Sequence, residues 1–180
     1  WSNYASVFQA TDFLGMLKNT VIVTAVVAVG QLLTSAMAGF AFSYLNFRGR
    51  EVIFKVFLFA VMIPFHVMLI PTFVIMRDLK LLNSLWALIL PCIVSSLGAF
   101  TMRQSYMSVP RSLGEAASLD GATPWGIWWR IYLPLSKPTL ATLAIFSFMQ
   151  TWNDFIRPLI FLNSNKKMTL TLGLYNMMGN

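Results

Sequence analysis

Residues 21–45 read VIVTAVVAVGQLLTSAMAGFAFSYL, a stretch of 25 residues without a charged side chain. As an α-helix this stretch would be about 37 Å long, enough to cross a hydrocarbon core of about 30 Å with some tilt. Small residues within it, among them Gly30, Ala36 and Gly39, allow a neighbouring helix to approach closely. The stretch therefore predicts a membrane-spanning helix that packs against other helices.

The composition of the chain is typical of a helical membrane protein. Of its 180 residues, 57% are apolar and only 11% are charged, whereas soluble domains carry about 25% charged residues. A net charge of +7 can indicate a nucleic-acid partner, but here the cations lie scattered between apolar stretches. Cations in that position flank membrane spans, so we expect a lipid membrane as a partner and no nucleic acid.

Three further apolar stretches are long enough to be spans, at about residues 52–76, 82–102 and 138–162. Pro64 and Pro71 lie in the first of them, where proline should kink a helix. Four spans predict an all-α, polytopic helical membrane protein. Because the chain lacks an initiator Met, we expect residues 1–180 to be a single transmembrane domain that is truncated at both ends.

The segment 103–137 is the longest one between two of these spans. Ser112 and Glu115 have the spacing of a capping box, which predicts that a short helix starts at Ser112. Gly121 can adopt the left-handed conformation that ends such a helix. The dipeptide Thr123-Pro124 is typical of the start of another short helix. Local rules thus predict a helix, a turn and a second helix in this segment.

A longer motif covers the same segment. Glu115-Ala116-Ala117 is followed by Gly121 and then by Ile131, Leu133 and Pro134, which gives the pattern E-A-A-x3-G-x9-I-x-L-P. This pattern resembles the cytoplasmic EAA loop in the membrane-spanning subunits of bacterial ABC importers. The likeness extends over about residues 15–165 and is strongest to the carbohydrate-type subfamily that contains the shorter maltose-transporter permease. It implies the type I ABC importer transmembrane fold, of whose usual six spans this chain would contain about four.

The resemblance also implies a function and a set of partners. Segment 103–137 would be a cytoplasmic coupling loop, with Glu115, Ala116, Ala117 and Gly121 at the surface that docks onto an ABC ATPase dimer. The chain would not be an enzyme and would bind no cofactor, since it lacks a Gly-x4-Gly-Lys-Ser/Thr loop; ATP and Mg would be bound by the ATPase. A second permease subunit and an extracytoplasmic solute-binding protein would complete an importer of a sugar or oligosaccharide in the bacterial cytoplasmic (inner) membrane.

Four residues are candidates for contact with the solute, namely His66, Trp152, Asn153 and Asp154. An aromatic ring beside an amide suits sugar binding, although Trp152 can equally belong to an interfacial aromatic belt. His66 is the single histidine, and an ionisable residue inside a span is a functional candidate, although it can also simply bond to a neighbouring helix. Asp154 can pair with Arg157 three residues later, as a structural contact or as part of a gate.

Other functions stay open at this stage. A permease of the same family could carry another solute, such as an amino acid or a phosphonate. A membrane-embedded enzyme would need converging ionisable groups in its spans, and only His66, Asp154 and Arg157 are available. A membrane scaffold without transport would not need the motif in segment 103–137. One histidine and one cysteine, Cys92, make no cluster that predicts a metal site.

The distribution of cations predicts the topology. Seven Lys and Arg residues lie in the connections on one side of the spans: Arg48, Arg50, Lys55, Arg103, Arg111, Arg130 and Lys137. The other side holds Lys18, Arg77, Lys80, Lys166 and Lys167, with Arg157 near it. The positive-inside rule places the set of seven, and with it segment 103–137, in the cytoplasm.

Cysteine labelling tests this orientation. In a Cys92→Ala background, the single substitutions Ser118→Cys and Asn165→Cys should react with a membrane-impermeant thiol reagent from opposite sides. In intact cells only Asn165→Cys should be labelled, and Ser118→Cys should react after permeabilisation. Labelling of Ser118→Cys in intact cells would reverse the topology.

Overall fold

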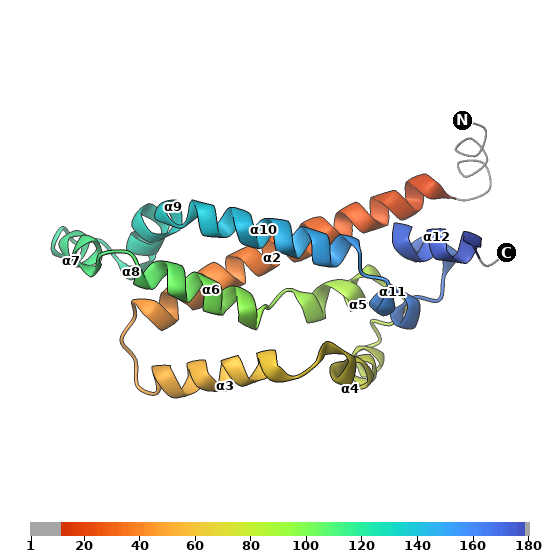
Figure 1. Cartoon of the computed structure of the whole chain (residues 1–180), viewed down its shortest axis with the longest axis horizontal. Helices are drawn as coiled ribbons and strands as arrows, with labels where there is room; N and C mark the ends of the chain where they lie inside the picture. The colour runs from red at the N-terminus through yellow and green to blue at the C-terminus, as the bar shows by residue number, and fades with distance from the viewer. Residues whose placement is uncertain (1–11, 179–180) are drawn as a thin grey trace. The chain divides into compact units, whose positions relative to one another are not determined.

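A computed structural model describes residues 12–178 (Figure 1). Every regular element within this range is a helix, which confirms the all-α prediction. The elements are α2 (Phe13–Ser43), α3 (Arg50–Met62), α4 (Phe65–Asp78), α5 (Leu85–Ile89), η1 (Leu90–Cys92), α6 (Ser96–Met107), α7 (Arg111–Leu119), α8 (Pro124–Ile127), η2 (Trp128–Tyr132), α9 (Leu133–Leu135), α10 (Lys137–Trp152), α11 (Ile156–Phe161), η3 (Asn165–Lys167) and α12 (Leu170–Met178).

Two helical stretches in the described range are long and apolar enough to cross a membrane, Phe13–Ser43 and Leu85–Met107. Two bent pairs of helices raise the number to four if each pair is one span. These pairs are α3 with α4, and residues 124–135 with α10. Helix α2 starts earlier than the predicted span, because the Asp12 carboxylate accepts a hydrogen bond from the Gly15 amide at 3.1 Å and so caps the helix.

The second predicted span, at about residues 52–76, consists of two helices and not of one kinked helix. Helix α3 ends at Met62 and α4 begins at Phe65, with the dipeptide Ile63-Pro64 between them. Proline lacks an amide hydrogen and disfavours helical geometry in the residue before it, so Pro64 breaks the helix and does not merely bend it. Pro71, by contrast, lies inside α4.

The prediction of a continuous fourth span over residues 138–162 is wrong. Helix α10 ends at Trp152, and α11 is a separate helix of six residues. The Asp154 carboxylate accepts a hydrogen bond from the Arg157 amide at 3.3 Å. An acceptor in this position satisfies a free amide at the start of a helix, which explains why a new helix begins there.

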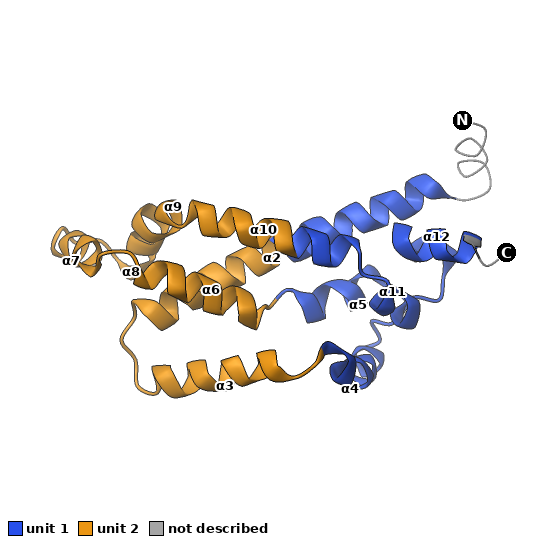
Figure 2. Cartoon of the chain, in the orientation of Figure 1, with its two compact units in different colours: residues 1–28, 65–93, 147–180 blue, residues 29–64, 94–146 orange. Residues whose placement is uncertain are grey.

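The helices form two compact units (Figure 2). Unit 1 comprises residues 1–28, 65–93 and 147–180, and unit 2 comprises residues 29–64 and 94–146. Each unit combines segments that are distant in the sequence. The chain passes between the units within α2, between α3 and α4, between η1 and α6, and within α10.

The core of unit 1 is largely aliphatic. Its buried members are Val23, Val27, Met76, Ala87, Leu88, Ile89, Cys92, Phe161 and Leu162. At its edge Asn83 has a positive φ of 55°, and its side-chain oxygen accepts hydrogen bonds from the amides of Asn163 and Ser164 at 3.2 and 3.1 Å. The Asn83 amide in turn donates to the Phe161 carbonyl at 2.8 Å. One asparagine thus joins the loop before α5 to the end of α11.

The core of unit 2 is mostly aromatic. Phe40 lies 5.2 Å from Tyr132 and 6.3 Å from Tyr106 between ring centroids. The indole nitrogen of the buried Trp128 donates a hydrogen bond to the Tyr106 hydroxyl at 3.3 Å. Such edge-to-face rings stabilise a core beyond the burial of their area. This cluster joins α2 and α6 to the helices of segment 103–137.

Close contact between α2 and α6 depends on the small residues that the sequence analysis identified. A β-carbon on Gly39 would lie 2.6 Å from the β-carbon of Met102 and 2.9 Å from the backbone nitrogen of Arg103. There is no room for such an atom unless the two helices move apart. The prediction that small residues in residues 21–45 permit close helix packing is confirmed at this position.

We expect Gly39→Ala to lower the free energy of unfolding by about 1–3 kcal/mol, the usual cost of overpacking a core. The matched control is Gly126→Ala in α8, where a β-carbon would meet its nearest atom at 3.5 Å; its effect should stay below about 0.5 kcal/mol. Thermal unfolding of the purified protein in detergent measures both. Equal melting temperatures for the two variants would contradict this account of the α2–α6 contact.

Candidate functional site

Helix α7 carries the Glu115-Ala116-Ala117 motif and ends in a defined turn. The Ala122 amide donates to the Ala117 carbonyl at 2.9 Å, and the Gly121 amide donates to the Ser118 carbonyl at 3.1 Å. Gly121 has a φ of +81°. This pair of hydrogen bonds around a left-handed glycine is a Schellman motif. The predicted left-handed stop at Gly121 is confirmed.

The start of α7 differs from the prediction. The helix begins at Arg111, with Pro110 in the capping position and no hydrogen bond from a side chain to the first amides. Ser112 therefore lies inside the first turn, and the predicted capping box of Ser112 with Glu115 is wrong. A proline at the cap is compatible with this geometry because its extended ψ of 123° lies outside the helical region.

Helix α7 is attached to the end of α2 through Tyr44. A β-carbon on the buried Gly114 would lie 2.6 Å from the Tyr44 ring, so only glycine permits this contact. The Arg111 guanidinium donates a hydrogen bond to the Tyr44 carbonyl at 3.2 Å. The Tyr44 ring itself packs 5.1 Å from Phe40 and 5.2 Å from Tyr132. These contacts tie α7 to the aromatic core of unit 2.

The opposite face of α7 is exposed. With 100° between successive residues, Glu115, Ala116 and Leu119 lie on one side, away from Gly114, and all three are exposed. Leu119 is 90% exposed, which is unusual for a large apolar side chain at the end of a helix. In unit 2, α7 extends past the other helices (Figure 2). Its outward surface thus includes one carboxylate, one small apolar residue and one leucine, together with the exposed Ser112.

The four residues expected at a docking surface are divided by the fold. Glu115, Ala116 and Gly121 are exposed, and a β-carbon on Gly121 would meet no atom within 4 Å. Ala117, in contrast, is half-buried and packs against the aromatic core. The fold therefore leaves the first two residues of the motif at the surface, while the third holds the helix in place.

The second half of the segment is helical, as predicted. The Thr123 hydroxyl accepts a hydrogen bond from the Gly126 amide at 3.2 Å, with Pro124 at the first helical position. The helix widens to a π-helix over Trp128–Tyr132. In this wider turn Trp128 and Tyr132 are both buried, while Trp129 between them is exposed.

The candidate solute-contact residues all belong to unit 1. Asp154 and Arg157 form a salt bridge of 2.8 Å, with side chains only 15% and 18% exposed. The Arg157 guanidinium lies 4.1 Å from the centre of the Phe65 ring, and Phe65 contacts His66 edge-on at 5.5 Å. The fold thus brings Asp154, Arg157 and His66 together around one phenylalanine. His66 itself is exposed.

Trp152 and Asn153 have local partners. The Trp152 ring stacks on Phe148 at 5.1 Å, and its carbonyl accepts a hydrogen bond from the Thr171 hydroxyl at 3.0 Å. The Asn153 amide nitrogen donates to the Met149 carbonyl at 2.7 Å. A group of three or more His, Cys, Asp and Glu side chains that could hold a metal ion does not occur among the described residues.

Comparison with known proteins identifies the family of this chain. Residues 31–180 match the family described as the binding-protein-dependent transport system inner membrane component. The chain belongs to this family.

Individual members of this transport family are similar over nearly the whole chain. The arabinooligosaccharides transport system permease protein AraQ of Halalkalibacterium halodurans is 40% identical over 173 residues, which cover 96% of this chain and 62% of that protein. The lactose transport system permease protein LacG of Rhizobium radiobacter is 36% identical over 172 residues, 96% of this chain and 63% of that protein. The chain thus spans somewhat over three-fifths of the length of these relatives.

A solved structure has the same fold. A chain in the crystal structure of a bacterial ABC transporter involved in the import of the acidic polysaccharide alginate matches with a TM-score of 0.85 and 29% identity. The match covers 91% of this chain and 58% of that one. The predicted transmembrane fold of ABC importers is therefore confirmed.

Sequence reasoning did not single out Leu119 or Tyr44. Leu119 follows Glu115 by four residues, so a helical projection of α7 would have placed the two on one face. Tyr44 lies in the first span and contacts Gly114 seventy positions later along the chain. No local pattern indicates such a contact.

The Asp154–Arg157 pair has a measurable consequence for stability. Arg157→Gln leaves a mostly buried carboxylate without its cation, which we expect to lower the free energy of unfolding by about 1–3 kcal/mol. Asp154→Asn combined with Arg157→Gln removes both charges and should recover part of this loss. Thermal unfolding of Asp154→Asn, Arg157→Gln and the double variant measures the coupling energy between the two side chains. Strictly additive effects of the two substitutions would contradict this coupling.

Proposed function

We propose that this chain is the membrane-spanning permease subunit of an ATP-driven importer, and that it does not itself act as an enzyme. The observation that carries the proposal is the outward face of α7. Glu115, Ala116 and Leu119 lie exposed on a short helix that ends at a left-handed glycine. A protruding helix tip with one carboxylate, one small residue and one apolar residue suits insertion into a socket of another protein.

The partner in this proposal is an ABC ATPase dimer. ATP and Mg would be bound and used by that dimer, and movement of its sockets would be transmitted through α7. The contacts of Gly114 and Arg111 with Tyr44 make such transmission physically reasonable, because they connect α7 to the end of α2 without a flexible linker. An extracytoplasmic solute-binding protein is a further proposed partner, which the description of the family as binding-protein-dependent supports, and a second permease subunit is proposed beside it.

The proposed solute is a sugar or oligosaccharide. The similar proteins include permeases for arabinooligosaccharides and lactose and an importer of the polysaccharide alginate. A 32% identical relative is the sn-glycerol-3-phosphate transport system permease protein UgpE of Yersinia pestis, which keeps another solute as the alternative. Trp152, Asn153, Asp154 and His66 remain the candidate contacts for the solute.

The proposed location is the bacterial cytoplasmic membrane, which the chain crosses several times with α7 in the cytoplasm. In unit 2, Arg50, Arg103 and Arg111 all line one cavity beside the aromatic core that seats α7. They belong to the cation-rich side, so this placement supports the orientation that the positive-inside rule predicts. The outward face of α7 would then point toward the cytoplasm.

Substitutions on the α7 tip test the proposal. Glu115→Lys reverses the charge presented to the socket, Leu119→Ser removes the apolar contact, and Gly121→Val strains the left-handed turn by about 1 kcal/mol. Each variant should insert into the membrane and melt near the wild-type temperature. Co-purification of the ATPase should fall at least about tenfold, and sugar uptake by the complete importer should be lost.

Two control variants separate docking from folding. Gly121→Asn replaces the glycine with a residue that tolerates the left-handed region, so it should retain the ATPase. Leu113→Ser changes a leucine of α7 that is only 45% exposed and lies to the side of the outward face. This variant should therefore also retain the ATPase. Wild-type ATPase binding and uptake in all three test variants would show that segment 103–137 is only a connector.

A further inference from the structure

Unit 2 contains a cavity of about 220 Å³ at the end of α2 and α6. Three arginines and three tyrosines contribute to its lining: Arg50, Arg103, Arg111, Tyr44, Tyr106 and Tyr132. They come from the last turns of α2 and α6 and from the starts of α3 and α7, with Tyr132 contributed by η2. Elements far apart in the sequence thus converge on one basic cavity.

The cavity has an excess of positive charge. Within residues 12–178, Glu51 is the one carboxylate that forms an ion pair with these arginines, at 2.7 Å from Arg103 and 3.3 Å from Arg50. The Glu51 side chain is half exposed, whereas Arg103 is only 12% exposed. Three guanidinium groups against the Glu51 carboxylate leave an excess of positive charge at a site that is partly shielded from water, and the nearby Glu115 carboxylate offsets part of it. An anion would gain more there than at an open surface.

The guanidinium groups are held in place largely by neutral partners. Arg103 donates to the Phe42 carbonyl at 3.1 Å and lies 3.9 Å from the centre of the Phe54 ring. Arg50 donates to the Leu45 carbonyl at 3.0 Å, and Arg111 to the Tyr44 carbonyl at 3.2 Å. A guanidinium has five N–H donors, so these bonds orient each arginine without using up its donors or its charge.

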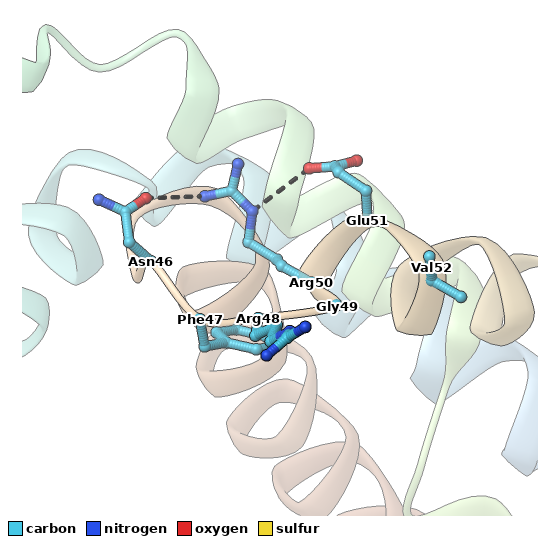
Figure 3. Close-up of a pocket in the computed structure, with 7 residues that line it drawn as sticks. All are labelled: Asn46, Phe47, Arg48, Gly49, Arg50, Glu51 and Val52. Atoms are coloured by element: carbon cyan, nitrogen blue, oxygen red, sulfur yellow. Dashed lines mark hydrogen bonds and ion pairs between the residues drawn. The ribbon is translucent and has the colours of Figure 1, made fainter.

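A second depression lies nearby, and it differs from the arginine cavity in the elements that line it. It is lined only by the consecutive residues 46–52 of the α2–α3 turn. Figure 3 shows Arg50 in this turn between Asn46 and Glu51. Because a single turn forms it, this depression is the outer surface of a loop. The cavity of 220 Å³, in contrast, is built from five separate elements.

We propose that the arginine cavity binds a phosphate group. Arginine forks match the geometry of phosphate oxygens and form strong charge-assisted hydrogen bonds with them. The volume lies below the roughly 300–1,000 Å³ of typical sites for whole small molecules, so it suits a head group and not a sugar. The cavity lies at the ends of two helical stretches long and apolar enough to span a membrane, and basic pockets near the ends of such helices are suited to the phosphates of anionic lipids.

The phosphate can come from an anionic phospholipid or from a soluble phosphate, and the experiment separates the two. The protein is placed in nanodiscs of phosphatidylcholine with or without phosphatidylglycerol, and lipid retained after detergent extraction is counted by native mass spectrometry. In a second arm, inorganic phosphate is titrated in phosphatidylcholine nanodiscs, and binding is followed by the shift in melting temperature. The site does not depend on the transport function, so neither arm requires an ATPase or a solute.

Variants of the lining residues decide the result. Combining Arg50→Gln with Arg111→Gln should reduce retention of phosphatidylglycerol or affinity for phosphate at least about tenfold, whereas Arg130→Gln removes an exposed cation outside the cavity and should have little effect. Glu51→Gln removes the competing carboxylate and should strengthen binding several-fold, which a purely structural role of the arginines would not produce. Preference for phosphatidylglycerol identifies a lipid site, and response to inorganic phosphate alone identifies a soluble ligand.

Three results would overturn the proposal. The first is that neither phosphatidylglycerol nor inorganic phosphate binds the wild-type protein. The second is equal binding by the wild type and the variant with both Arg50→Gln and Arg111→Gln, provided that both melt cooperatively. The third is an equal loss of binding in Arg130→Gln, which would mean that the overall charge and not the cavity attracts the anion. Arg111→Lys guards against misfolding, since it keeps the charge and should lose affinity only through the poorer geometry of lysine.

Discussion

The packing of α7 on the Tyr44 ring is the contact on which the proposed coupling depends. Tyr44 directly follows α2, packs in the aromatic core against Phe40 and Tyr132, and leaves no space for a side chain at position 114. Helix α7 has only nine residues, which is too short to be stable by itself in water. Its geometry therefore comes from this seat and from the Schellman turn at Gly121. A rigid seat for a short helix is what allows an exposed tip to transmit force.

The helices of this chain are interrupted where polar groups can satisfy the free backbone. Asp154 accepts the first free amide of α11 and at the same time pairs with Arg157. The side-chain oxygen of Asn83 likewise accepts hydrogen bonds from the backbone amides of Asn163 and Ser164. In a membrane protein, irregular backbone is tolerated only where such partners exist. The break between α10 and α11 therefore coincides with Asn153 and Asp154, two of the candidates for contact with the solute.

Arginine has two roles at the cation-rich end of unit 2. Arg103 and Arg111 donate to the carbonyls of Phe42 and Tyr44 at the C-terminal end of α2, where a helix has free acceptors and favours positive charge. The same guanidinium groups face a cavity of their own. The excess of cations in this part of the chain thus serves both to join helices and to create a site for an anion, in addition to its effect on topology.

The sequence by itself determined the class of the protein, the first and third spans, the turn at Gly121 and the family motif. These follow from apolar length, from local backbone preferences and from residues at fixed spacing, all of which are properties of contiguous stretches. Only the tertiary structure decided that Ala117 packs against the aromatic core and that three arginines from separate helices meet in one cavity. The physical reason is that each of these depends on contacts between residues far apart in the chain, such as Tyr44 with Gly114 or Arg103 with Glu51, and no local pattern carries that information.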